Sequence, residues 1–69
     1  MIAFEVKDMT CGHCARTITQ ALTATDKDAR VHIDLPTRRV QVEPAAADAE
    51  ALTRAIQAAG YTPVPVAAT

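Results

Sequence analysis

The stretch RVHIDLPTRRVQVE (residues 30–43) decides the fold, because it has the pattern of two short strands joined by a turn. On both sides of the turn, apolar side chains alternate with polar ones: Val31, Ile33, Leu35, Val40 and Val42. Alternation with a period of two is typical of a strand with one buried face. Pro36 and Thr37 supply the turn, and Pro44 ends the second strand. We therefore expect a β-hairpin in the middle of the chain.

Helical patterns flank this hairpin on both sides. Before it, a helix is expected from Gly12 or His13 to about Thr25. Its apolar residues form one stripe: Ala15, Ile18 and Leu22. After the hairpin, Asp48 is a candidate N-cap for a second helix, and Gly60 stands where a left-handed C-cap is needed. The apolar residues between them follow the helical period: Leu52, Ala55, Ile56 and Ala59.

Two further strands are expected at the ends of this pattern, over residues 2–7 and 62–66. Their apolar residues alternate along the chain: Ile2, Phe4 and Val6 in the first, Val64 and Val66 in the last. The order βαββαβ predicts an α+β fold, a ferredoxin-like sandwich of a four-stranded antiparallel sheet with both helices on one face. The last strand should lie at a sheet edge, where Pro63 and Pro65 are tolerated although neither can donate a ladder hydrogen bond.

Length and charge limit what the chain can do. Its 69 residues make one domain, expected over residues 1–66, followed by a short flexible tail at 67–69. Seven Lys+Arg against eight Asp+Glu give a formal net charge of −1, so there is no basic surplus for binding nucleic acid. No run approaches the roughly 18 consecutive apolar residues of a spanning helix, so membrane insertion is not expected.

Cys11 and Cys14 are the only cysteines, and their expected surroundings indicate chemistry. The chain does not open with a basic leader and an apolar stretch, so we expect a cytoplasmic protein whose thiols stay reduced. A disulfide across so short a loop would stabilise the fold very little. Two reduced thiols at this spacing therefore indicate metal binding or redox chemistry.

The expected helix start explains how the two sulfurs are activated. Cys11 is placed in the loop after the first strand and Cys14 in the first turn of the helix, with Gly12 letting the loop turn without a side-chain clash. The partial positive charge at the helix N-terminus should lower the thiol pKa values. Two thiolates suit a soft ion such as Cu(I). A structural zinc site needs four ligands, and the chain offers at best His13 as a third.

Residues 9–14 read MTCGHC, and with this motif the chain resembles the heavy-metal-associated (HMA) domain family. This family of soluble copper chaperones and N-terminal domains of copper-transporting P-type ATPases shares a Met-x-Cys-x-x-Cys motif. The resemblance covers about Ile2 to Val66, with Ile18 and Leu22 in the first helix and residues 58–61 in the last loop. The tyrosine in that loop and the stand-alone length are similar to bacterial copper chaperones.

The resemblance implies Cys11 and Cys14 as the metal ligands, Met9 as a buried prop for the loop, and Tyr61 close to the metal. The cargo would be Cu(I), with one ion per chain or one shared between two chains, and the chain would not be an enzyme. The partner would be the metal-binding domain of a copper-transporting P-type ATPase, which receives the ion by thiolate ligand exchange. A copper-responsive regulator is a second implied partner.

Several alternatives stay open. His13 is a candidate third ligand, a stabiliser of a copper-bridged homodimer, or a modulator of the exchange rate. Ag(I), Hg(II) or Zn(II) could occupy the same site, with Asp8 as an added ligand for zinc, although the neutral Thr10 favours Cu(I). Residues 11–14 are also the tetrapeptide of disulfide isomerases. Against a thiol–disulfide oxidoreductase, the chain is shorter than a thioredoxin-like domain and has no Trp before the first cysteine.

Overall fold

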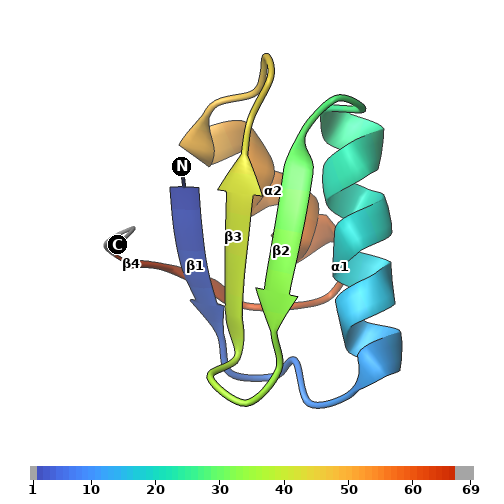
Figure 1. The fold of residues 1–69 in the computed structure, drawn as a ribbon, viewed down its shortest axis with the longest axis vertical. Coiled ribbons are helices and arrows are strands. Elements are labelled where there is room, and N and C mark those ends of the chain that lie inside the picture. Colours follow the sequence, from blue (N-terminus) through green and yellow to red (C-terminus); the bar gives the residue numbers. More distant parts are fainter. Residues whose placement is uncertain (1, 67–69) are drawn as a thin grey trace.

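Six elements follow one another in the expected order (Figure 1). The computed structural model describes residues 2–66, so the tail expected at 67–69 lies outside the described residues. The elements are β1 (Ile2–Val6), α1 (Gly12–Thr25), β2 (Arg30–Asp34), β3 (Arg39–Glu43), α2 (Ala49–Ala58) and β4 (Pro63–Val66). The βαββαβ order predicted from the sequence is confirmed.

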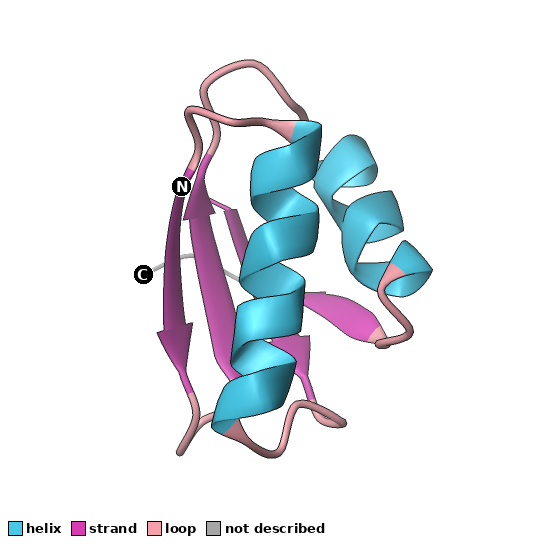
Figure 2. Ribbon diagram, turned by 90° about the vertical axis from the view of Figure 1, so that its right-hand side faces the viewer, coloured by secondary structure: helices cyan, strands magenta, loops and turns pink. Residues whose placement is uncertain are grey.

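The four strands form one antiparallel sheet in the order β2-β3-β1-β4, and both helices lie on the same side of it (Figure 2). The register places Phe4 opposite Val40 and Val40 opposite Ile33. Phe4 and Val40 are fully buried, so this row faces the helices. The opposite face of β2 and β3 is polar: Arg30, His32, Asp34, Arg39, Gln41 and Glu43. The predicted ferredoxin-like α+β sandwich is therefore confirmed.

β4 lies at an edge of the sheet, as its prolines predicted. Pro63 and Pro65 stand at alternate positions, so β4 can donate hydrogen bonds to β1 only from Val64 and Val66. The nitrogens of both prolines face the outer rim, which discourages another strand from pairing there. Pro63 is also buried, whereas Val64 is 45% exposed. The buried position of β4 is thus filled by a proline, which the sequence pattern did not predict.

The core lies between the sheet and the two helices. Its fully buried side chains come from both layers: Phe4, Val6, Met9, Ile18, Leu22, Val40, Val42, Leu52 and Ile56. Burial of a side chain of this size contributes about 1.5–3 kcal/mol relative to exposure. Leu35 is the exception in the hairpin, because β2 ends at Asp34 and leaves Leu35 in the turn, 36% exposed.

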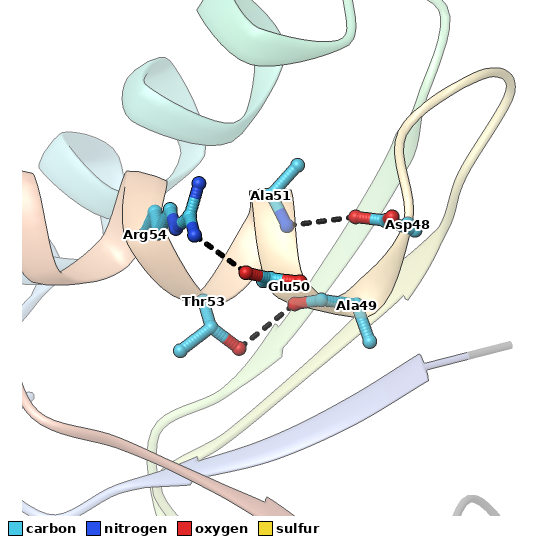
Figure 3. A network of polar contacts seen from close by, with 6 residues as sticks. All are labelled: Asp48, Ala49, Glu50, Ala51, Thr53 and Arg54. Atoms are coloured by element: carbon cyan, nitrogen blue, oxygen red, sulfur yellow. Dashed lines mark hydrogen bonds and ion pairs between the residues drawn. The ribbon is translucent and has the colours of Figure 1, made fainter.

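The start of α2 has the predicted cap. The Asp48 carboxylate accepts a hydrogen bond from the Ala51 N–H at 2.9 Å, as expected of an N-cap (Figure 3). Glu50 in the first turn pairs with Arg54 one turn later, on the exposed side of the helix (Figure 3). The ion pair is solvated, so it adds little to the stability that the cap provides.

The end of α2 is fixed by Gly60, also as predicted. Its φ is +96°, in the left-handed region that glycine adopts without steric cost. The Gly60 N–H donates to the Gln57 carbonyl at 3.0 Å, and the Tyr61 N–H donates to the Ile56 carbonyl at 3.2 Å. These are the two bonds of a Schellman motif. The motif turns the chain sharply and determines where Tyr61 begins the next loop.

A buried carboxylate that the sequence did not reveal joins α1 to the approach of α2. Asp26 follows α1 and is 6% exposed. Its Oδ2 accepts hydrogen bonds from the N–H groups of Ala45, Ala46 and Ala47 at 2.8, 2.8 and 3.0 Å. These bonds, led by the one from Ala46, hold the pKa of the Asp26 carboxyl below its usual value of 3.8. The folded state therefore favours the charged carboxylate.

Asp26→Asn should lower the melting temperature at neutral pH by several degrees, because the amide lacks the charge that three N–H groups stabilise. Since the folded pKa lies below 3.8, the wild-type advantage should be complete above about pH 4 and should disappear as the pH falls through the lowered pKa. Thermal unfolding followed by circular dichroism at a series of pH values measures both effects. Asp28→Asn, at an exposed aspartate nearby, is the control. Equal effects of the two substitutions would contradict the assignment.

Candidate metal centre

Three connecting segments are joined by hydrogen bonds near the end of β1, and two of them, the β1–α1 loop and the hairpin turn, lie side by side below the sheet (Figure 1). They are the loop between β1 and α1 (residues 7–11, here called the metal loop), the hairpin turn at 35–38, and the loop at 59–62. The Arg38 guanidinium donates to the Lys7 carbonyl at 3.3 Å. The Thr62 N–H donates to the Asp8 carboxylate, also at 3.3 Å. No sequence pattern predicted either contact, and both tie the metal loop to a neighbouring turn.

Met9 anchors the metal loop in the core. Its side chain is fully buried, whereas Lys7, Asp8 and Thr10 around it are exposed. The Met9 N–H donates to the Val6 carbonyl at 3.1 Å. Met9 is thus buried where the resemblance placed it, and its insertion directs the following residues to the surface.

Cys11 and Cys14 lie together at the surface beyond this anchor. Both are free thiols, and their Sγ atoms are 3.5 Å apart. Cys11 is exposed and has extended backbone at the N-cap of α1, while Cys14 is half-buried in the first turn of the helix. No side chain caps the start of α1, so the first backbone N–H groups of the helix have no side-chain acceptor and lie beside the two sulfurs. The expected need for glycine at position 12 is wrong, because a Cβ on Gly12 would meet no atom within 4 Å.

Hydrogen bonds to Cys14 favour its thiolate. The bond with the Tyr61 hydroxyl is the main cause that lowers the pKa of the Cys14 thiol from 9.0 to about 7. The backbone of Thr10 and the side chain of Cys11 add to this effect. The same contact raises the pKa of Tyr61 to about 12, so the phenol stays protonated and can donate to the sulfur. A large share of Cys14 is therefore thiolate at neutral pH, which is the form that binds metals.

The other two candidate ligands are not gathered around the sulfurs. His13 is exposed in the first turn of α1. The carboxylate of Asp8, the candidate ligand for zinc, accepts a hydrogen bond from the Thr62 N–H. Within residues 2–66, no group of three or more His, Cys, Asp or Glu side chains is arranged to hold a metal ion. The site therefore consists of two sulfurs with a tyrosine beside one of them.

Comparison with known families decides the kind of domain. The model of the heavy-metal-associated domain family matches residues 3–62. The chain belongs to this family. The resemblance inferred from residues 9–14 is therefore confirmed, and the HMA domain described here is a metal-binding domain.

Its relatives handle copper and another soft metal. The HMA domain is 36% identical over 61 residues to Copper-transporting ATPase 2 of Rhizobium meliloti (strain 1021), a match that covers 87% of this chain and 7% of the ATPase. The crystal structure of a gold binding protein is 38% identical with a TM-score of 0.90, and the match covers 96% of this chain and 100% of that one. The copper chaperone Atx1 from Synechocystis PCC6803 is 33% identical with a TM-score of 0.88, covering 91% and 98% of the two chains. Within residues 2–66, neither helix has the length and apolar character to cross a membrane.

Tyr61→Phe should raise the pKa of the Cys14 thiol, because it removes the hydroxyl that contributes most to lowering it. The alkylation rate of Cys14 at pH 7 should then fall severalfold, since only the thiolate reacts quickly. The measurement is the pH dependence of iodoacetamide modification, with Cys11 and Cys14 separated by mass spectrometry. Thr62→Val, at the exposed neighbour, is the control. An unchanged pH profile in Tyr61→Phe would show that the phenol does not act on this sulfur.

Proposed function

We propose that this HMA domain is a metallochaperone that binds Cu(I) through Cys11 and Cys14 and delivers it to a copper-transporting P-type ATPase. The observation that carries the proposal is the pair of free thiols 3.5 Å apart at an exposed corner. Cytoplasmic residence follows as part of the proposal, because the site works only while both thiols stay reduced.

The donor set favours a soft ion with few ligands. Thiolate sulfurs select Cu(I) over hard cations, whereas a structural zinc site requires two more ligands than this corner supplies. With metal–sulfur bonds of roughly 2.3 Å, sulfurs 3.5 Å apart would hold an ion at an S–metal–S angle of roughly 100°. A wider angle requires the sulfurs to separate. Cys11, on the exposed loop, is better placed to make that movement than Cys14 on α1.

Exposure of the pair favours delivery by ligand exchange. An incoming thiolate from a partner can bond to Cu(I) before one of the two original sulfurs leaves. The partner thiol loses its proton to become this incoming thiolate, and the departing sulfur takes up a proton as its bond to the metal breaks. The ion is thus never free in solution. The exposed sulfur of Cys11 is the first that a partner can reach.

The similarity to a copper-transporting ATPase supports the choice of partner. The chain is 36% identical over 61 residues to that ATPase. Transfer between two related domains with similar affinities for the ion would be opposed by little free energy. Delivery to a copper-responsive regulator and a metal-bridged homodimer remain predictions. The βαββαβ sandwich weighs against the thiol–disulfide oxidoreductase alternative, because it is not the thioredoxin-like fold in which that tetrapeptide acts.

A second soft ion is a reasonable alternative cargo. The likeness to a gold binding protein at 38% identity favours binding of soft metals beyond copper. Ag(I) and Hg(II) share the preference for two thiolates. Zn(II) binding is less favoured, because the Asp8 carboxylate that could add a third ligand already accepts a hydrogen bond from the Thr62 N–H.

Wild-type protein should take up one Cu(I) per chain, or one shared by two chains, while Cys11→Ser and Cys14→Ser should each lose tight binding because the chelate needs both sulfurs. The measurement is an anaerobic titration of the reduced protein against a competing Cu(I) chelator, with Ag(I) and Zn(II) in parallel. Thr17→Ser, at a hydroxyl on the same helix, serves as the control. Tight binding in either cysteine variant would mean that other groups hold the ion.

His13→Ala should change the Cu(I) affinity, measured between about pH 6 and 8, because the imidazole lies between the two cysteines in the sequence and is a candidate third ligand. Competition titrations at several pH values measure the effect. His32→Ala, at an exposed histidine on the open face of the sheet, is the matched control. Identical affinities of wild type and His13→Ala across this range would remove His13 from the site.

A further inference from the structure

Arg38 holds an unfavourable backbone conformation in the hairpin turn. Its φ is +56°, and it is the one non-glycine residue with a positive φ within residues 2–66. The Arg38 N–H donates to the Leu35 carbonyl at 3.1 Å, so closure of the turn places this residue in the left-handed region. Glycine or asparagine adopts that region more easily than arginine does. An arginine that tolerates the strain is expected to use its side chain.

Arg38 makes two hydrogen bonds to the end of β1 and the start of the metal loop. Its carbonyl accepts a hydrogen bond from the Val6 N–H at 2.8 Å. Its guanidinium donates to the Lys7 carbonyl at 3.3 Å. Val6 is the last residue of β1 and Lys7 is the first residue of the metal loop. Arg38 thus holds two consecutive residues at the root of the loop.

Asp8 holds the same loop from the other side. Its carboxylate accepts the Thr62 N–H at 3.3 Å. Thr62 directly follows Tyr61, the residue that contributes most to lowering the pKa of the Cys14 thiol. The root of the metal loop is therefore tied to the hairpin turn by Arg38 and to the loop at 59–62 by Asp8.

We propose that Arg38 is a positioning residue of the metal site, which together with Asp8 limits how far the sulfur of Cys11 moves from that of Cys14. Cys14 lies within α1, whereas Cys11 is the N-cap: its carbonyl accepts from the Ala15 N–H at 3.1 Å, and it is the last residue of the metal loop, with extended backbone. A loop that is already held in place loses less conformational entropy when the two sulfurs take up an ion. The proposal rests on the proposed function only for the identity of that ion.

Arg38→Gly removes the guanidinium and its hydrogen bond to Lys7 without disturbing the turn. Glycine adopts a positive φ easily, so the hairpin turn should not be destabilised. Amide hydrogen exchange at residues 8–12 of the metal-free protein should become at least roughly threefold faster. The Cu(I) affinity should fall by about threefold to tenfold. Arg38→Lys keeps a cationic donor and should restore most of the protection. Arg39→Gln removes the same charge from the adjacent exposed position and should change neither quantity.

Asp8→Ala should loosen the same amides, while Asp8→Asn, which keeps an oxygen acceptor, should leave them close to wild type. Equal exchange at residues 8–12 in wild type and Arg38→Gly would overturn the positioning role. A uniform increase over all strands would also overturn it, since that is a loss of general stability. If exchange changed as expected but no form of the protein bound Cu(I), the proposed function would fail and the positioning role would stand.

Discussion

The burial of one methionine determines where the two thiols lie. Met9 enters the core from the middle of an exposed loop, and the residues on both sides of it stay in water. In a domain of this size the core is small, so a side chain worth about 1.5–3 kcal/mol is a large part of the net stability. Methionine has a flexible shape that fills an irregular gap between helix and sheet. The metal loop is therefore anchored in the core at Met9, while Thr10 and Cys11 directly after it lie at the surface.

The two sulfurs differ because different parts of the fold hold them. Cys14 belongs to α1, a 14-residue helix whose far end is capped by Asp26, with the Asp26 N–H donating to the Leu22 carbonyl. Cys11 belongs to the loop and is the more exposed of the two. Tyr61 is the main hydrogen-bond partner that lowers the pKa of Cys14. One sulfur thus lies within a helix and ionises readily, while the other is exposed at the end of a loop whose root is tied on both sides.

The apolar periodicity of the sequence was enough to predict the helices and strands. The Cys-x-x-Cys spacing was enough to predict a pair of thiols at the start of α1. Asp48 and Gly60 could be recognised because caps depend on residues close by in the chain. The position of Tyr61 followed only from the family resemblance, since no spacing connects it with Cys14. Proline at position 63 was read only as a mark of an edge strand, so its burial was missed.

Contacts between distant segments could not be predicted. Asp26 binds N–H groups that lie 19 to 21 residues later in the chain, and no local pattern marks that contact. Arg38 carries none of the usual signals of a left-handed residue, which are glycine and asparagine. Asp8 pairs with Thr62 across most of the chain. These three polar contacts hold the loops in place, whereas the apolar pattern specifies the layers.

The pairing of the first and last strands has a consequence for how such domains are assembled into larger proteins. Ala3 lies opposite Val66, so the beginning of β1 and the end of β4 are neighbours, while the sulfurs follow the other end of β1. Linkers attached at these two points would leave the metal corner clear. A chain extended at either end of this domain would therefore keep the two thiols accessible. The relatives that the chain matches differ greatly in length: the match covers 98% of a small chaperone and 7% of an ATPase.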